Sequence, residues 1–428
     1  MKAINRLDRT MKHPNLRIDK KNQYEYWFIL CLSSYVLFTI FDLLLFGKNA
    51  IQWGVLYNGY DFIADYTNVI GYASNLNPYN STMVFGLHER AYPPLQYLVS
   101  YFISTNVSDI NIYYDAQNFT SLYVEPKVTF LYLLFVIISV VSFFECIRVY
   151  KNGSEIIRTL TALSLSLSFP IIFTIERGNS ILAVIVFVLF YLCFYDHDNR
   201  FLRELAFIAL AIAAAIKMSP AILGVLLLFE KRWRDAIRTV IYGLLLFFMP
   251  FLFFKDGFNN IPLFFRNLSL QLEAYKYDAG CTIKGYIIYF SPYFVYDNFE
   301  TINTICSVIT VLICILLLLA AFLTKRKCDR LLYLLLILII LPSHSAMYCV
   351  LYIIPCLVAF LNECDKKTLD KYILLGGVFC VCRLGGDIGM LLINAHNGLL
   401  IILLCAIIKS FETVIVTFKS KNNVVIKY

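Results

Sequence analysis

The sequence predicts an all-α polytopic membrane protein, because its composition is too apolar for a soluble fold. Of its 428 residues, 60% are hydrophobic and only 15% are charged, whereas an average soluble domain is roughly half apolar and about a quarter charged. A single soluble core stops growing at about 250–300 residues, so one core could not bury this excess. The composition therefore excludes a soluble enzyme, a disordered chain and a secreted disulfide scaffold.

Apolar runs of membrane-spanning length recur along the chain. A helix needs about 20 apolar residues to cross a hydrocarbon core of ~30 Å, and on that measure we expect about 10–12 spans. The single spans lie at about 27–46, 128–149, 159–175, 180–195, 235–254, 302–323, 371–392 and 398–418, and two broken hairpins lie at 204–230 and 331–361. Pro220 and Pro342 interrupt the two hairpins, because proline removes a helical hydrogen bond.

The basic residues give the orientation. Lys and Arg outnumber Asp and Glu by 37 to 29, a net charge of +8, and they fall in short runs between the apolar segments. This is the positive-inside pattern of a membrane protein, so we expect no nucleic-acid partner. It places a basic amino terminus (1–24) and a tail (419–428) in the cytoplasm, with one transmembrane domain (25–418) between them. The polar segments at about 47–126 and 255–300 are then external loops.

Two carboxylates in the first external loop are candidates for acid–base chemistry. Asp61 and Asp65 are four residues apart, so on a helix both would share one face. A carboxylate at the outer membrane surface can act as a general base that takes a proton from an attacking hydroxyl. The alternative is that both are solvated loop acids.

Four further polar sites interrupt apolar runs, where an ionisable group is costly and usually faces a cavity or a partner. They are Glu176-Arg177-Gly178-Asn179, Lys217, His344 and Arg383, of which Arg383 is most simply an internal ion pair to Asp387. Arg177 lies in a short turn, Lys217 in the first hairpin and His344 at the break of the second. Cations at the outer tips of short hairpins would attract an anion, since arginine binds phosphate through a planar fork and lysine as a point charge. The alternatives are a turn that Arg177 merely caps, a Lys217 that snorkels to the interface and a satisfied core histidine at His344.

These elements, in this order, resemble glycosyltransferase family 87 of the GT-C superfamily, which includes the polyprenol-phosphate-mannose-dependent α-mannosyltransferases. The motifs that carry the resemblance are Asp61-Phe62-Ile63-Ala64-Asp65, Pro78-Tyr79, Tyr92-Pro93-Pro94-Leu95, Arg177-Gly178-Asn179, Ile216-Lys217-Met218-Ser219-Pro220, Lys231-Arg232-Trp233-Arg234 and, loosely, Pro342-Ser343-His344. The resemblance covers about residues 25–360. Asp65 stands where the family often has tyrosine, so it is open which of the two carboxylates is the base.

The resemblance implies a GT-C-type helical bundle that transfers a hexose, mannose in the best-known cases, from a polyprenyl-phosphate sugar to a glycan or glycolipid acceptor. The reaction would invert the anomeric configuration on the outer face of a multi-pass membrane protein, in the plasma membrane of a bacterium, during surface polysaccharide synthesis. An apolar groove beside the first hairpin would hold the polyprenyl tail. The implied site residues are the catalytic carboxylates Asp61 and Asp65, the donor-phosphate ligands Arg177 and Lys217, and the substrate contacts Tyr92, Asn179 and His344.

We expect no cofactor, because the sequence shows no metal-ligand spacing of His and Cys; the alternative is a metal ion held by the acid pair Asp61 and Asp65. Two other functions fit the membrane plan. One is a polymerase of lipid-linked polysaccharide repeat units, which should carry paired arginine-rich external loops. The other is a flippase or transporter, which should show repeated halves with helix breaks in corresponding positions. The chain has the breaks at Pro220 and Pro342 but no visible repeat.

Overall fold

The structure is a computed structural model that describes residues 23–46, 63–81, 90–107, 125–342, 345–363, 367–382 and 394–425. The regular structure within these ranges is entirely helical, which confirms the predicted fold class. The α-helices are α1 (Gln23–Phe46), α2 (Ala64–Ala73), α3 (Pro94–Ser104), α4 (Pro126–Tyr150), α5 (Glu155–Ser166), α6 (Phe169–Arg177), α7 (Ile181–Phe194), α8 (Arg200–Ile216), α9 (Val225–Phe229), α10 (Trp233–Phe248), α11 (Asn260–Ala274), α12 (Ile283–Phe290), α13 (Pro292–Asp297), α14 (Phe299–Leu323), α15 (Lys327–Ile340), α16 (Ile354–Asn362), α17 (Thr368–Val381) and α18 (Ala395–Val425). The 3-10 helices are η5 (Pro78–Asn80), η9 (Ser219–Gly224), η10 (Met249–Phe253), η11 (Gly257–Asn259) and η12 (Met347–Ile353).

Five helical segments of the described chain are long and apolar enough to cross a membrane. They are Gln23–Leu45, Pro126–Tyr150, Trp233–Phe253, Phe299–Leu323 and Ala395–Lys419. They coincide with the spans predicted near 27–46, 128–149, 235–254, 302–323 and 398–418. The remaining predicted spans correspond to shorter or bent helices, so the total of 10–12 spans stays a prediction. The described part of the span predicted at 371–392 forms α17, which ends at Val381, and residues 383–392 lie outside the described ranges.

The span predicted at 159–175 is not one straight helix. It consists of α5 and α6, which meet at an angle of 41°. Pro170 lies in the first turn of α6, and proline has no N–H to donate to the preceding turn and clashes with it. The helix therefore stops at Ser166, and the Ser168 hydroxyl donates to the Leu165 carbonyl at 2.6 Å instead.

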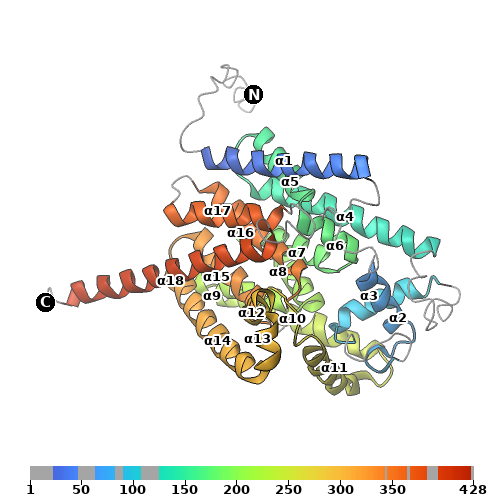
Figure 1. The fold of residues 1–428 in the computed structure, drawn as a ribbon. Coiled ribbons are helices and arrows are strands. Elements are labelled where there is room, and N and C mark those ends of the chain that lie inside the picture. Colours follow the sequence, from blue (N-terminus) through green and yellow to red (C-terminus); the bar gives the residue numbers. More distant parts are fainter. Residues whose placement is uncertain are drawn as a thin grey trace.

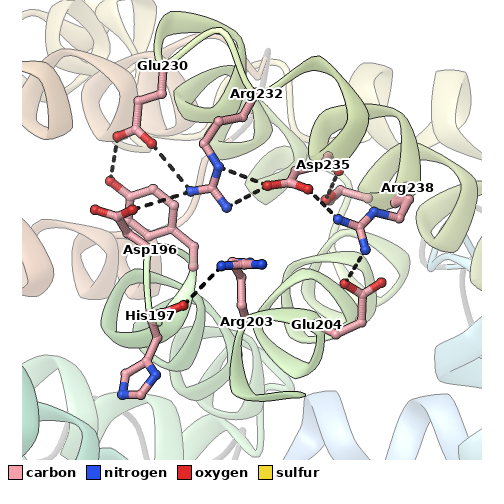
Figure 2. A network of polar contacts seen from close by, with 10 residues as sticks. Asp196, His197, Arg203, Glu204, Glu230, Arg232, Asp235 and Arg238 are labelled. Atoms are coloured by element: carbon pink, nitrogen blue, oxygen red, sulfur yellow. Dashed lines mark hydrogen bonds and ion pairs between the residues drawn. The ribbon is translucent and has the colours of Figure 1, made fainter. Parts of the chain in front are cut away.

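The predicted hairpin at 204–230 is present as α8, η9 and α9, and both of its ends lie in one polar cluster. Figure 2 shows Arg232 between Asp196, Glu230 and Asp235. Across the same cluster Arg238 pairs with Glu204 at 2.6 Å. Pairing between residues before α8 and residues after α9 requires the segment between them to go in and return, as the basic residues on both flanks predicted.

Helix α15 forms the centre of the bundle, because every residue from Leu331 to Ile340 is buried. A helix that is apolar all round must be enclosed by other elements, and α14, α16, α18, η9 and η12 pack around it. The two ends of α15 lie toward opposite ends of the molecule. Figure 1 shows α2, α3 and α11 gathered at one end, which we call the α2–α3 end, while the carboxyl terminus of α18 projects from the other, which we call the C-terminal end.

The aromatic segments at the α2–α3 end form a small core of their own. The ring of Tyr79 lies 5.2 Å from that of Tyr97, 5.8 Å from Phe251 and 5.7 Å from Phe264. The amide of Asn267 donates to the carbonyls of Tyr79 and Arg90. The two segments predicted as loops, at about 47–126 and 255–300, are therefore packed against each other and contain α2, α3 and α11.

Candidate functional site

The turn between α6 and α7 packs tightly against the start of α2. Gly178 ends α6 with a left-handed φ of 68°, a backbone conformation that only glycine adopts without strain. A Cβ at this position would lie 2.8 Å from Cβ of Tyr66 and 3.0 Å from Cα of Ile63. The Ile63 N–H donates to the Glu176 carbonyl at 2.7 Å, which joins the two segments directly.

Ile63 itself has a positive φ of 47°, which is a strained conformation for a β-branched residue. Such strain persists only where the surroundings impose it, and it concentrates at functional sites. Asp65 lies in the first turn of α2, which begins at Ala64, just after this left-handed residue. Asp61 lies outside the described residues, so a face shared by the two carboxylates stays a prediction.

Asp65, in the first turn of α2, is held by the α6–α7 turn. Its Oδ1 accepts from Nη2 of Arg177 at 2.9 Å, and its Oδ2 accepts from Nδ2 of Asn179 at 2.7 Å. Asn179 is fully buried, and its own Oδ1 accepts from the Ile181 N–H at 3.0 Å. Because Asn179 is fixed on both sides, it holds the Asp65 carboxylate in one position with both oxygens engaged.

Lys217 ends α8 at the same end of the molecule and has a different environment. Its Nζ lies 5.3 Å from the centre of the Tyr92 ring and 5.2 Å from that of Tyr348, within the range of a cation–π interaction. No carboxylate of the described residues forms an ion pair with it, although the charge of Asp65 acts on it over a longer distance. The charges of Asp65 and Arg177 also act on Tyr348, whose ring contacts the lysine.

A cavity of about 560 Å³ opens beside Lys217. Among the described residues Lys217 is the one cation in its lining, and apolar side chains from η9, α11 and the last turn of α15 make up much of the rest. The lining residues are Ala91, Tyr92, Pro93, Lys217, Met218, Ser219, Ile222, Leu268, Gln271, Leu272, Ile337, Leu338, Leu341, Pro342, Ser345, Ala346, Tyr348 and Cys349. A cavity of this size with one cation and one apolar wall suits a ligand that is itself charged at one end and apolar elsewhere.

A second, almost wholly apolar groove of about 520 Å³ shares Met218 with this cavity and runs between α8 and α10. Small residues keep it open, among them Ala214, Gly224 and Gly243. A Cβ on Gly243 would meet no atom within 4 Å. An apolar chain could therefore continue from the cavity into the groove without displacing any side chain at this position.

Comparison with known proteins decides the family. The protein-family model for glycosyltransferase family 87 matches residues 91–350, which is more than half of the chain. The chain belongs to glycosyltransferase family 87. It is thus a membrane glycosyltransferase that works with a sugar donor and an acceptor. The searches of curated proteins and of solved structures gave no match.

The matched segment of this family 87 transferase contains most of the predicted site residues. Tyr92, Arg177, Asn179 and Lys217 all fall within it and lie at the α2–α3 end. Asp65 precedes the match, yet the structure joins it to Arg177 and Asn179. His344 falls within the match but outside the described residues.

Two contacts of the transferase were missed from the sequence. Tyr348 looked like one more aromatic residue in an apolar run, and only its ring contact with Lys217 gives it a place in the site. The Ser180 hydroxyl donates to Oε1 of Gln96 at 3.1 Å, which ties α3 to the residue after Asn179. The described residues contain no group of three His, Cys, Asp or Glu side chains that could hold a metal ion.

Proposed function

We propose that this family 87 transferase moves a mannose-like hexose from a polyprenyl-phosphate sugar to a glycan or glycolipid acceptor on the extracytoplasmic face. The observation that carries the proposal is Lys217, a half-buried cation without an ionic partner among the described side chains, at the edge of a cavity with an apolar wall. A lipid phosphate matches this arrangement, because its charge neutralises the lysine and its chain covers the apolar surface.

The groove between α8 and α10 supports the same donor. It continues from Met218, next to Lys217, and is lined almost entirely by apolar side chains. The isoprenoid chain of the donor would lie in this groove, while the sugar would point toward Tyr92 and Tyr348. A nucleotide sugar would leave such a groove empty, since both of its ends are polar.

Asp61 is our candidate for the general base, and Asp65 for its positioning partner. Both oxygens of Asp65 already accept hydrogen bonds, from Arg177 and Asn179, so Asp65 is poorly placed to receive a proton. In the proposed step the acceptor hydroxyl gives its proton to Asp61, and its oxygen forms a bond to the anomeric carbon. The bond from that carbon to the phosphate oxygen breaks, and the polyprenyl phosphate leaves with the electron pair.

The geometry of attack and departure on opposite faces inverts the anomeric configuration, through an oxocarbenium-like transition state as in glycoside hydrolysis. Negative charge grows on the leaving phosphate during this step. Lys217 would stabilise that charge, as preorganised cations do in other transfer reactions. Arg177 is already paired with Asp65, so it would hold that carboxylate and act on the phosphate as a second role. His344 stays a candidate substrate contact.

The test is sugar transfer in membranes that contain the wild-type protein, native acceptor and a panel of polyprenyl-phosphate and nucleotide sugars. We expect transfer from polyprenyl-phosphate sugars and none from nucleotide sugars. In Lys217→Met the transfer rate should fall by about 10- to 100-fold, since a hydrogen bond to a charged group contributes about 1.5–3 kcal/mol. Lys284→Met is the matched control, because Lys284 also lies over an aromatic ring, that of Phe299 at 5.4 Å.

Two results would contradict the proposal. Transfer from a nucleotide sugar would remove the need for a lipid phosphate at Lys217. Absence of transfer from every lipid-linked sugar, with the protein folded and acceptor present, would favour a repeat-unit polymerase or a transporter.

A further inference from the structure

A second polar cavity lies at the C-terminal end, far from Lys217. Its volume is about 630 Å³, and it forms where the end of α14, the first turn of α15, the start of α17 and the face of α18 meet. Asp329, in the first turn of α15, lines it, whereas Leu338 in the last turns of the same helix lines the Lys217 cavity. A 14-residue helix is about 20 Å long, so the two cavities are separate sites.

The lining of this cavity is amphipathic. Leu323, Leu369 and Val416 are apolar, and the other lining side chains carry hydroxyl or charged groups. The lining residues are Leu323, Thr324, Lys325, Asp329, Lys367, Thr368, Leu369, Lys409, Glu412, Thr413, Val416 and Thr417. A ligand that matches this lining therefore has a charged or polar part, which contacts the lysines and hydroxyls, and an apolar part.

The acids deepest in this region are already neutralised. Lys409 is 4% exposed, and its Nζ lies 2.8 Å from Oδ1 of Asp329 and also bonds Asp370. Arg326 donates two hydrogen bonds to Asp370, at 3.1 and 2.7 Å. Neither Asp329 nor Asp370 is therefore left to repel an anion from the cavity.

The charges at the rim are, by contrast, unmatched. Lys325 and Lys367 are exposed, and neither forms an ion pair with a carboxylate of the described chain. Glu412 is the one acid on the rim that is likewise without an ion pair in the described ranges. The rim thus carries two cations against one anion, a net charge that one monovalent anion would neutralise.

The cavity adjoins an exposed apolar surface of α18, because Val416 belongs to both. Phe411, Ile415 and Val416 are between 50% and 65% exposed, and they belong to the apolar segment Ala395–Lys419 that is long enough to span the membrane. Figure 1 shows the carboxyl-terminal part of α18 projecting beyond α14 and α17. In a membrane, acyl chains would cover such an exposed apolar surface.

We propose that this cavity binds the headgroup of an anionic phospholipid from the leaflet at the C-terminal end. Its phosphodiester lies between Lys325 and Lys367, the threonine hydroxyls lie around the glycerol, and the acyl chains follow Leu323, Leu369 and Val416. Basic pockets between membrane helices bind anionic headgroups in this way. The site is independent of the proposed sugar donor and stands whether or not that donor is correct.

The experiment is native mass spectrometry of the full-length protein in detergent, with phosphatidylglycerol and phosphatidylcholine of the same acyl chains in competition. We expect the wild type to retain phosphatidylglycerol preferentially. A basic residue near an anionic lipid contributes about fivefold in affinity, so the double variant Lys325→Gln, Lys367→Gln should lose roughly twentyfold of that preference. The charge-preserving variant Lys325→Arg, Lys367→Arg should keep it, which separates loss of charge from loss of fold.

Lys371→Gln is the matched control, since Lys371 lies on α17 but over the Tyr24 ring at 4.8 Å, away from the cavity. Equal retention of the two lipids by the wild type would overturn the proposal, and so would an unchanged preference in the glutamine double variant. Displacement of the bound lipid by millimolar inorganic phosphate would also overturn it, because the site would then serve a soluble anion.

Discussion

The two ends of the molecule hold their charges in different ways. At the C-terminal end, Arg326, Lys409, Asp329 and Asp370 form a buried network in which each charge has a partner of opposite sign. At the α2–α3 end, Lys217 has two tyrosine rings and no ionic partner among the described residues. Both arrangements place charge in an apolar bundle, so burial alone does not distinguish them.

The difference separates charges that are paired within the protein from a charge that has no ionic partner among the described residues. A buried ion needs compensation, because its desolvation costs several kcal/mol, on the order of the stability of a domain. The network at the C-terminal end supplies that compensation from the chain itself. Lys217 receives no such compensation from a described carboxylate, and in the proposed mechanism the phosphate of the donor supplies it.

The largest expected effect tests the chemistry at the α2–α3 end. Asp61→Asn should lower the rate of sugar transfer by about 10²–10⁴-fold, the usual contribution of a general base. Asp65→Asn should cost less, because asparagine can still accept from Arg177 through its amide oxygen. The measurement is the initial rate of transfer at matched protein levels. A larger loss in Asp65→Asn than in Asp61→Asn would reverse the two roles.

The second effect tests the paired network. Asp370→Asn removes the shared anion of Arg326 and Lys409, and breaking a buried pair in this way destabilises a fold by about 3–5 kcal/mol. Thermal unfolding in detergent should shift to a clearly lower temperature. Glu273→Gln is the control, since the Glu273–Lys276 pair lies at the solvent-accessible end of α11 and such pairs contribute about 0–1 kcal/mol. A similar shift in both variants would mean that the buried network stabilises the protein no more than an exposed ion pair does.

A third prediction concerns the turn that holds Asp65. Gly178→Ala should destabilise the protein by at least about 1–2 kcal/mol, the cost of a left-handed backbone in a residue with a Cβ. The new Cβ also lies too close to Tyr66 and Ile63. Displacement of α2 should weaken the contact of Asp65 with Asn179, so transfer should fall together with stability. Wild-type activity and stability in this variant would show that the turn has room that the structure does not reveal.

The smallest effect on stability is expected at the second glycine. Gly243→Leu extends into the groove between α8 and α10, where a Cβ meets no atom, and replacing glycine in a helix removes a penalty of up to about 1 kcal/mol. The fold should be unchanged or slightly more stable, whereas transfer from a long-chain polyprenyl donor should fall. Transfer from the same sugar on a geranyl phosphate should be affected less. An equal loss with both donors would place the isoprenoid chain elsewhere.

Much of the fold follows from local sequence. Apolar runs of spanning length predicted the five long helices, because the bilayer requires about 20 apolar residues per span. The hairpin around Pro220 was also predictable, since basic runs flank both of its ends and proline interrupts its middle. The bend at Pro170 was overlooked, although the same property of proline explains it. Hydropathy averages over a window, so it does not distinguish a bent pair from a straight span.

Some features of the site were likewise predictable from the sequence, whereas others required the tertiary structure. The sequence by itself determined that Arg177, Asn179 and Lys217 interrupt apolar segments, because charge and polarity are properties of single residues. Only the tertiary structure decided that Arg177 and Asn179 bind the two oxygens of Asp65, across separations of 112 and 114 residues. It alone placed Tyr348 against Lys217. No periodicity records such pairs, because they depend on how α2, α6 and η12 pack together. That packing pairs Arg177 with a carboxylate and leaves Lys217 against two tyrosine rings.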